Sequence, residues 1–381
     1  MSRLDRKTFC HYKMELNTNQ QAFFALVRAG LWKQEARVSP SDIIDYKEVY
    51  RIAEEQSVVG LVAAGLEHLA DVRAPKEDVL QFVGQALQLE QRNKVMDVYL
   101  AELIELFRKK DVYAILVKGQ GIAQCYEKPL WRASGDVDLL LSDSNYEKAK
   151  QILMPLAERT EDEYKTFKHL GLTMPGGYVV ELHGTLHSRL SKRVDGVIDE
   201  AQHDVFFAGN VRSWQNGNTQ VFLPAADNDV IFVFTHILHH YYIECIGLRQ
   251  ICDWCRLLWT YRYKLDVKLL EKRLLEAGLM SEWRAFAALA VDWLGMPVEA
   301  MPLYSHDKKW SRKAGRILAF VLECGNFGHN RQVSSGKLSS AWNKAKDFAN
   351  HVWVFPGDSI KFFAHFMVDG IKLATAEKDT K

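Results

Sequence analysis

Apolar residues recur every three or four positions in two long parts of the chain, from about residue 19 to 110 and from residue 227 onward. This spacing lines one face of an α-helix with apolar side chains, so both parts are predicted to be helical. The expected helices cover 20–32, 58–70, 79–90 and 95–110 in the first part, and 228–244, 248–262, 267–279, 283–295 and 312–325 in the second.

Between these two parts, short apolar runs bounded by glycine or proline replace the helical spacing. Runs of this kind are typical of buried strands, and the pair Gly176 and Gly177 predicts the turn of a hairpin. The expected elements are strands at 112–119, 136–142 and 219–224, a hairpin over 169–186, and helices over 120–129 and 145–158.

The order of these elements predicts an α+β protein. A small mixed β-sheet core is expected over residues 111–224. An N-terminal helical segment, 1–110, and a C-terminal helical domain, 225–381, would flank this core. Each of these three segments has the size of an ordinary domain.

The composition is that of an ordinary folded protein and limits the function only by exclusion. Apolar residues make up 48% and charged residues 25% of the 381 residues. Lys and Arg number 49 against 48 for Asp and Glu, a net charge of +1, so no overall attraction to nucleic acid or membranes is expected. This balance argues against a processive polymerase and leaves a small nucleotide ligand open.

Targeting features and cysteine usage predict a cytoplasmic protein. The N-terminal stretch MSRLDRKTFCHYKMEL contains basic residues but lacks the apolar core of a signal peptide. No apolar run approaches the ~20 residues that span a bilayer, so no membrane span is expected. The six cysteines are sparse and irregularly spaced, which fits a reducing compartment.

Two aspartates, Asp136 and Asp138, stand one residue apart at the start of the strand expected at 136–142. Because side chains alternate along a strand, both carboxylates face one side and Val137 faces the other. A chain of this composition contains about six acid-x-acid pairs by chance, so the surroundings must decide what this pair means. Glu181 supplies a third acid inside another apolar strand, with His183 on the same face.

Three carboxylates brought together repel one another unless a cation shares their charge. Carboxylate oxygens suit Mg²⁺ or Mn²⁺, so the sequence predicts a metal site at Asp136, Asp138 and Glu181. Upstream, Lys118 and Gly119 stand where a strand turns into a helix, and backbone N–H groups at such a corner favour an anion.

Histidines and cysteines in the second helical part offer a weaker metal signal. The histidines have helical spacing and a C-x-x-C pair follows them, so a zinc site is conceivable. The surrounding aromatic and aliphatic residues favour a packed helix instead, with buried structural cysteines. The residues concerned are His236, His239, His240, Cys252 and Cys255.

The segments LVKGQGIAQCYEKPLWRASGDVDLLL and VVELHGTLH resemble the nucleotidyltransferase family 5 proteins of the DNA polymerase β-type superfamily. The family pattern is K-G, then R-x-x-G-D-[IV]-D-L-L, then [DE]-L-H. The later segment FTHILHHYYIECIGLRQICDWCRLL is similar to that family's histidine-containing helix and R-x-x-x-D helix, and the likeness covers about residues 45–260. The chain departs from the wider superfamily at the glycine corner, where Lys118-Gly119-Gln120 replaces the usual Gly-Ser.

The resemblance implies transfer of a nucleoside monophosphate from an NTP to an acceptor, with Mg²⁺ or Mn²⁺ as cofactor and release of pyrophosphate. Asp136 and Asp138 would hold two metal ions, and Glu181 would complete one metal site and take the proton from an acceptor hydroxyl. For Arg249 and Asp253 an i,i+4 ion pair is the simpler explanation. The residues expected to contact nucleotide or acceptor are Lys118, Gly119, Arg132, Gly135, His183, Arg249 and Asp253.

The near-neutral charge favours a small molecule or a protein side chain as acceptor over a nucleic acid. Two alternatives stay open. One is a metal-dependent glycosyltransferase, whose D-x-D pair also holds a nucleotide through Mn²⁺. The other is a non-catalytic descendant of the nucleotidyltransferase fold that acts as a binding or scaffold protein.

Overall fold

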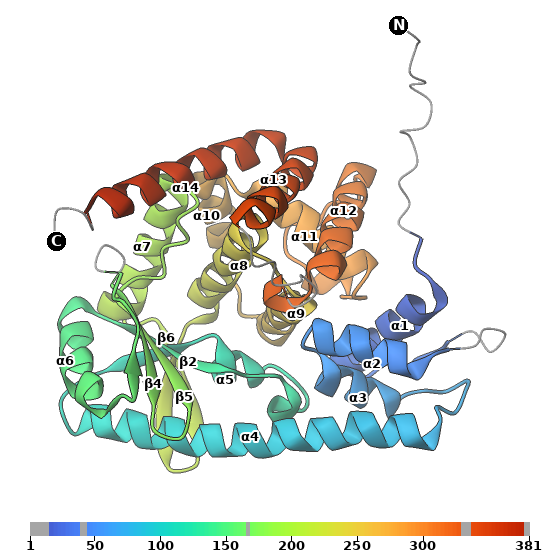
Figure 1. The fold of residues 1–381 in the computed structure, drawn as a ribbon, viewed down its shortest axis with the longest axis horizontal. Helices are drawn as coiled ribbons and strands as arrows, with labels where there is room; N and C mark the ends of the chain where they lie inside the picture. Colours follow the sequence, from blue (N-terminus) through green and yellow to red (C-terminus); the bar gives the residue numbers. More distant parts are fainter. Residues whose placement is uncertain (1–14, 39–43, 165–167, 329–336, 377–381) are drawn as a thin grey trace, which may run out of the picture.

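The fold is known from a computed structural model, which describes residues 15–38, 44–164, 168–328 and 337–376. Residues 1–14, which form most of the stretch MSRLDRKTFCHYKMEL, lie outside the described residues. Figure 1 shows the N-terminal helices gathered at one end of the long helix α4 (Lys76–Arg108), and the sheet with α6 (Asp143–Leu153) at the other end. The C-terminal helices lie above both.

The helices follow the predicted apolar spacing closely in both helical parts. The predicted helices 79–90 and 95–110 form one continuous helix, α4, because the polar residues between them include neither proline nor glycine. The other α-helices are α1 (Thr18–Trp32), α2 (Tyr46–Glu55), α3 (Val59–Leu66), α5 (Gly119–Ala123), α7 (Lys192–Phe207), α8 (Ala226–Ile243), α9 (Leu248–Tyr261), α10 (Val267–Ala277), α11 (Met280–Asp292), α12 (Lys308–Cys324), α13 (Lys337–Val354) and α14 (Pro356–Ala376).

A seven-stranded mixed sheet forms the core, in the order β3-β4-β5-β2-β1-β7-β6. Strands β2 and β5 pair in parallel, as do β1 and β7, while the remaining neighbours are antiparallel. The predicted α+β fold with a mixed sheet between helical segments is therefore confirmed. The strands are β1 (Ala114–Val117), β2 (Asp136–Leu141), β3 (Arg159–Thr160), β4 (His169–Met174), β5 (Tyr178–His183), β6 (Val211–Asn216) and β7 (Thr219–Pro224).

Each face of the sheet packs into a different apolar cluster. On one face, Val137 and Leu139 of β2 pack with side chains of α6 and of the C-terminal half of α4, such as Phe107. On the other face, Leu140 belongs to the larger cluster that includes α8, α9 and the N-terminal helices. Asp136 and Asp138 share this second face by the alternation of β2, so they point toward the helices that follow the core.

The core region differs from the predicted elements at β3 and β6, which were not predicted, and at two helices. The predicted helix 120–129 ends at Ala123, because the chain turns so that the Cys125 carbonyl accepts from Arg256 Nε at 2.8 Å. Helix α7 was not predicted, although its buried side chains have helical spacing and Ser191 caps its first turn by accepting from the Val194 N–H.

A buried glutamine joins the N-terminal helices to the C-terminal helices. Gln56, at the end of α2, donates its side-chain amide to the Val321 carbonyl at 3.1 Å and accepts from the Leu248 N–H at 2.9 Å. Both contacts satisfy polar groups that would otherwise be stranded in an apolar interior. They fix the start of α9 against α2.

Glu282 in α11 predicts a pH-dependent stability. Its side chain is buried, the Tyr242 hydroxyl donates to Oε1 at 2.9 Å, and burial followed by the charge of Asp358 raises the pKa of Glu282 to about 8. The unfolded carboxyl group titrates near 4.5, so between these values the folded state keeps a proton that the unfolded state releases. The free energy of unfolding should therefore fall by up to about 1.4 kcal/mol per pH unit from pH 4.5 to 8.

Urea unfolding at pH 5, 6, 7 and 8 measures this slope, and Glu282→Gln is expected to remove it because glutamine carries no titrating proton. A slope of the same size in that variant would assign the pH dependence to other groups.

Two further features concern the cysteines and the longest helices. The five cysteines among the described residues are buried, as the sequence predicted for Cys252 and Cys255. No helix in the described part of the chain is both long enough and apolar enough to cross a bilayer.

Candidate active site between the sheet and helices α8 and α9

Parallel pairing of β2 and β5 brings the three predicted acids together. Asp138 lies beside Glu181 in the register, and Asp136 is two residues away on the same face. One carboxylate oxygen from each of Asp136, Asp138 and Glu181 lies within 4.8 Å of the others. Donors that close fit a shared divalent cation, and all three are oxygen atoms of the kind that Mg²⁺ prefers.

The pKa shifts of residues on this face reflect repulsion among the three carboxylates. The neighbouring charge of Asp138, with burial as the second cause, raises the pKa of Asp136. Lys118 Nζ lies 2.7 Å from Asp138 Oδ1. Burial opposes the charge of Lys118, but the carboxylates of Asp138, Glu181 and Asp136 outweigh it and raise the lysine pKa. A single lysine therefore balances part of the charge of three acids.

Two histidines contact the acids. His183 Nε2 lies 2.9 Å from Asp138 Oδ1, and His169 Nε2 lies 3.3 Å from Glu181 Oε2. Burial lowers the pKa of His183, but its contacts with the two carboxylates outweigh burial and raise it. Burial would raise the pKa of Glu181, yet hydrogen bonds with both histidines lower it, so Glu181 stays ionised.

The turn between β1 and α5 holds Lys118 in a conformation that non-glycine residues rarely adopt. Its backbone has φ 57° and ψ −146°, and Gly119 follows with φ 42°. A side-chain-bearing residue in this region costs about 1–3 kcal/mol, which the surrounding packing must offset. In this conformation the Lys118 ammonium contacts Asp138 of the aspartate pair.

The acids open into a cleft of about 840 Å³, including its mouth, between the sheet and helices α8 and α9. The predicted residues Lys118, Gly119 and Arg132 line it. His236, His240 and Gln250 also line the cleft, although they were not predicted to belong to this site. The i,i+4 spacing of the two histidines was the available signal, because it places both side chains on one face of α8. The cleft residues from α8 and α9 are Val233, His236, Ile237, His240, Arg249, Gln250 and Asp253.

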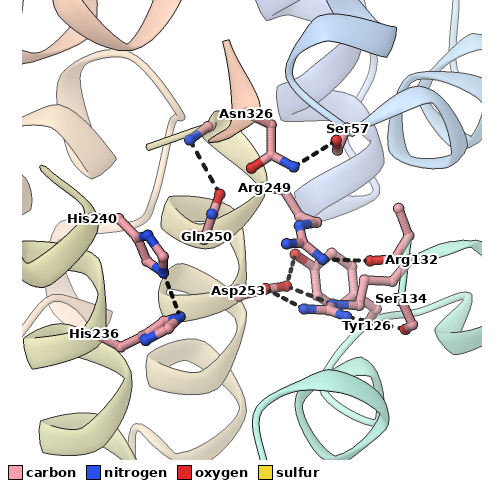
Figure 2. A network of polar contacts seen from close by, with 12 residues as sticks. Ser57, Tyr126, Arg132, Ser134, His236, His240, Arg249, Gln250, Asp253 and Asn326 are labelled. Atoms are coloured by element: carbon pink, nitrogen blue, oxygen red, sulfur yellow. Dashed lines mark hydrogen bonds and ion pairs between the residues drawn. The ribbon is translucent and has the colours of Figure 1, made fainter. Parts of the chain in front are cut away.

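Arg132 is fixed by a buried ion pair with Asp253 of α9 (Figure 2). Arg132 Nε and Nη2 lie 3.0 and 2.6 Å from the two carboxylate oxygens, a bidentate geometry that gives strong, directional contacts. The Tyr126 hydroxyl also donates to Asp253, at 2.8 Å. Asp253 thus binds the loop before β2 to α9, and the Arg132 guanidinium is already engaged by a carboxylate.

Arg249 holds the same loop from a second point. Its Nη1 donates to the Ala133 carbonyl at 2.8 Å, and burial lowers its pKa. The loop continues through Gly135, where a Cβ would meet nothing within 4 Å, into Asp136. Both arginines expected to contact nucleotide or acceptor therefore also anchor the backbone that carries the aspartate pair.

The histidines of α8 form a polar pair that faces α9 (Figure 2). His236 Nε2 and His240 Nε2 lie 3.1 Å apart, and His239 Nδ1 lies 2.7 Å from the Ser188 carbonyl. Burial lowers the pKa of His239 to about 4 and that of His236 well below its ordinary value, so both are neutral at pH 7.

The predicted zinc alternative finds no support in this geometry. Within the described ranges, two groups of three side chains have metal-ligand atoms within 4.8 Å of one another, and neither contains a cysteine. Cys252 and Cys255 are fully buried in α9, and burial raises the pKa of both thiols. Both cysteines are therefore packing residues, as the apolar surroundings predicted.

Comparisons with known proteins place the chain in a family. A sequence profile described as uncharacterised nucleotidyltransferase matches residues 42–295. No match was found among curated proteins. The crystal structure of an antigenic nucleotidyltransferase-like protein from Paracoccidioides brasiliensis is 13% identical and covers 53% of this chain and 93% of its own, with a TM-score of 0.31, too low to carry an argument. Because the profile spans more than half of the sequence, the chain belongs to the family of uncharacterised nucleotidyltransferases.

Proposed function

We propose that the protein transfers a nucleoside monophosphate from an NTP to a small-molecule or protein acceptor and releases pyrophosphate. The observation that carries this proposal is the convergence of Asp136, Asp138 and Glu181 at the wall of a cleft. Family membership supports the same chemistry at the level of the transferase class.

The donor set fits a divalent cation such as Mg²⁺ or Mn²⁺. Asp136, Asp138 and Glu181 would hold the metal, which when bound polarises the α-phosphate and neutralises charge on the leaving pyrophosphate. The lowered pKa of Glu181 supports a role in holding a cation more than a role in accepting a proton. Lys118 lies beside Asp138 and would move its charge to a phosphate when a cation takes its place.

Arg132 and Arg249 would assist nucleotide binding in two ways, by positioning the loop before β2 and by their positive charge. Both line the cleft and both hold the loop before β2, so they fix the position of Asp136 while presenting positive charge to an anionic ligand. Positioning and charge stabilisation account for most of the rate enhancement in phosphoryl transfer. This arrangement therefore suits a reaction that needs little covalent chemistry from the protein.

A second cavity, beside the acidic cleft, suits a small acceptor molecule. It has a volume of about 820 Å³, including its mouth, and lies between the N-terminal helices and the 126–133 segment. Arg132 and Arg249 line both this cavity and the acidic cleft, so the two spaces share a wall. Trp131 and Leu61 give it apolar surface, which suits a small organic acceptor.

An isotope experiment tests the proposed function. The full-length protein is incubated with Mg²⁺, a cell extract and NTP labelled at either the α- or the γ-phosphate. Transfer of α-label alone to an acceptor is expected, because the nucleoside monophosphate is retained and pyrophosphate leaves. Transfer of γ-label alone would indicate a kinase and would overturn the proposal.

The two alternatives give different outcomes in the same experiment. A glycosyltransferase would transfer sugar from a nucleotide sugar and no α-label from an NTP. A non-catalytic binding or scaffold protein would transfer neither label, and the absence of a thermal shift with NTP and Mg²⁺ would favour it. The non-catalytic alternative is the stronger of these two, because Lys118 and His183 already contact Asp138.

A further inference from the structure

The hairpin of β4 and β5 carries a second group of possible metal ligands next to the aspartate pair. His169 and His183 are direct partners in the antiparallel register, so their side chains emerge on the same face, and Glu181 shares that face. Ligand atoms of His169, Glu181 and His183 all lie within 4.8 Å of one another. This group of three was not predicted, because no sequence pattern singled out His169.

The separations match the spacing of atoms around a small cation. His169 Nε2 and His183 Nε2 lie 3.3 and 3.4 Å from the same oxygen, Glu181 Oε2. Tetrahedral ligands at bonds of ~2.05 Å, typical of Zn²⁺ with nitrogen and oxygen, lie ~3.4 Å apart. The imidazole rings are stacked with centroids 4.8 Å apart, and both Nε2 atoms face the same carboxylate oxygen.

The chemistry of these donors differs from that of the aspartate pair. Two imidazole nitrogens and one carboxylate oxygen suit Zn²⁺ and neighbouring transition ions, whereas Mg²⁺ prefers oxygen alone. His183 Nε2 also lies 2.9 Å from Asp138 Oδ1, so His183 connects this group to the aspartate pair. His183 is largely buried, while His169 and Glu181 are partly exposed, so an ion has a path from solvent.

We propose that His169, Glu181 and His183 form a transition-metal site that shares Glu181 with the carboxylate site. A carboxylate bridging two ions is the arrangement that two-metal centres use to fix their separation at ~3.5–4 Å. The outcome would be a mixed centre, with an oxygen-rich position for Mg²⁺ and a histidine-containing position for an ion such as Zn²⁺. The inference does not depend on nucleotidyl transfer, because metal binding is measured without a nucleotide.

Zinc binding by the metal-free full-length protein tests this site. Competition with a chromogenic chelator gives the Zn²⁺ affinity of wild type, His169→Gln and Asp136→Asn. Glutamine replaces the imidazole with an amide of similar size, so affinity should fall at least about 10–100-fold, as it does even when only a supporting partner is lost. Asp136→Asn should bind Zn²⁺ within a few-fold of wild type, because Asp136 belongs only to the carboxylate group.

His187→Gln is the matched control, because His187 also contacts a carboxylate, Asp199 at 2.7 Å, but lies outside the cluster. It should bind Zn²⁺ like wild type. Co²⁺ provides a second readout, since its visible absorption reports imidazole coordination and should weaken in His169→Gln. Circular dichroism confirms that each variant is folded.

Two results would overturn the site. The first is wild-type Zn²⁺ affinity in His169→Gln, and the second is loss of Zn²⁺ binding in Asp136→Asn alone, which would place the ion on the aspartates. Either result leaves nucleotidyl transfer with Mg²⁺ untouched, so failure of this inference is distinct from failure of the proposed function.

Discussion

Replacing Asp136 with asparagine is expected to abolish Mg²⁺-dependent transfer of the α-label while leaving the protein folded. The substitution keeps the shape of the side chain but removes one of three anionic oxygens in the carboxylate group. Loss of several kcal/mol of charge stabilisation corresponds to a fall in rate of at least about 10³-fold. The initial rate of label transfer and the thermal midpoint measure the two parts of this prediction.

Stability should not suffer, because Asp136 is in an unfavourable position when ionised. The charge of Asp138 and burial raise the pKa of Asp136, so removing the negative charge relieves repulsion. We expect an unchanged or higher thermal midpoint. Asp199→Asn, an exposed aspartate outside the cleft, is the control and should keep both activity and stability. Full activity of Asp136→Asn would remove the aspartate pair from the chemistry.

Replacing Asp253 with asparagine is expected to lower the free energy of unfolding by about 3–5 kcal/mol. Asp253 and Arg132 are both buried, and the neutral amide would leave the guanidinium without a compensating charge. The Tyr126 hydroxyl would also lose its charged acceptor. Urea unfolding at pH 7 measures the change.

A double variant separates the buried charge from the general packing of this region. Arg132→Met combined with Asp253→Asn removes both charges and keeps similar volumes, so it should recover much of the lost stability. It should not recover activity, because Arg132 also positions the loop that leads into β2. Equal destabilisation in single and double variants would mean that the ion pair contributes little beyond packing.

The local features of the site could be predicted from the sequence because they depend on short-range rules. Alternation along a strand placed Asp136 and Asp138 on one face and Val137 in the opposite core. The pattern of apolar runs and the Gly176 and Gly177 turn predicted the hairpin that carries Glu181.

The contacts between distant segments could not be predicted in the same way. Nothing in local spacing indicates that Asp253 accepts from Arg132, 121 residues earlier, because that contact depends on how α9 packs against the loop. The same holds for Lys118, whose ammonium reaches Asp138 only because the strained turn before Gly119 directs it there. A role for His169 was not predicted, because that role depends on its pairing with His183 between β4 and β5.

Binding of Mn²⁺ to the three carboxylates tests the account most directly. Anomalous X-ray scattering from crystals grown with Mn²⁺ and a non-hydrolysable NTP analogue locates the bound ion directly. We expect Mn²⁺ at about 2.1 Å from oxygens of Asp136 and Asp138, with Lys118 Nζ withdrawn from Asp138 toward a phosphate. Crystals that contain the nucleotide but no Mn²⁺ at these aspartates, with Lys118 still on Asp138, would contradict the account.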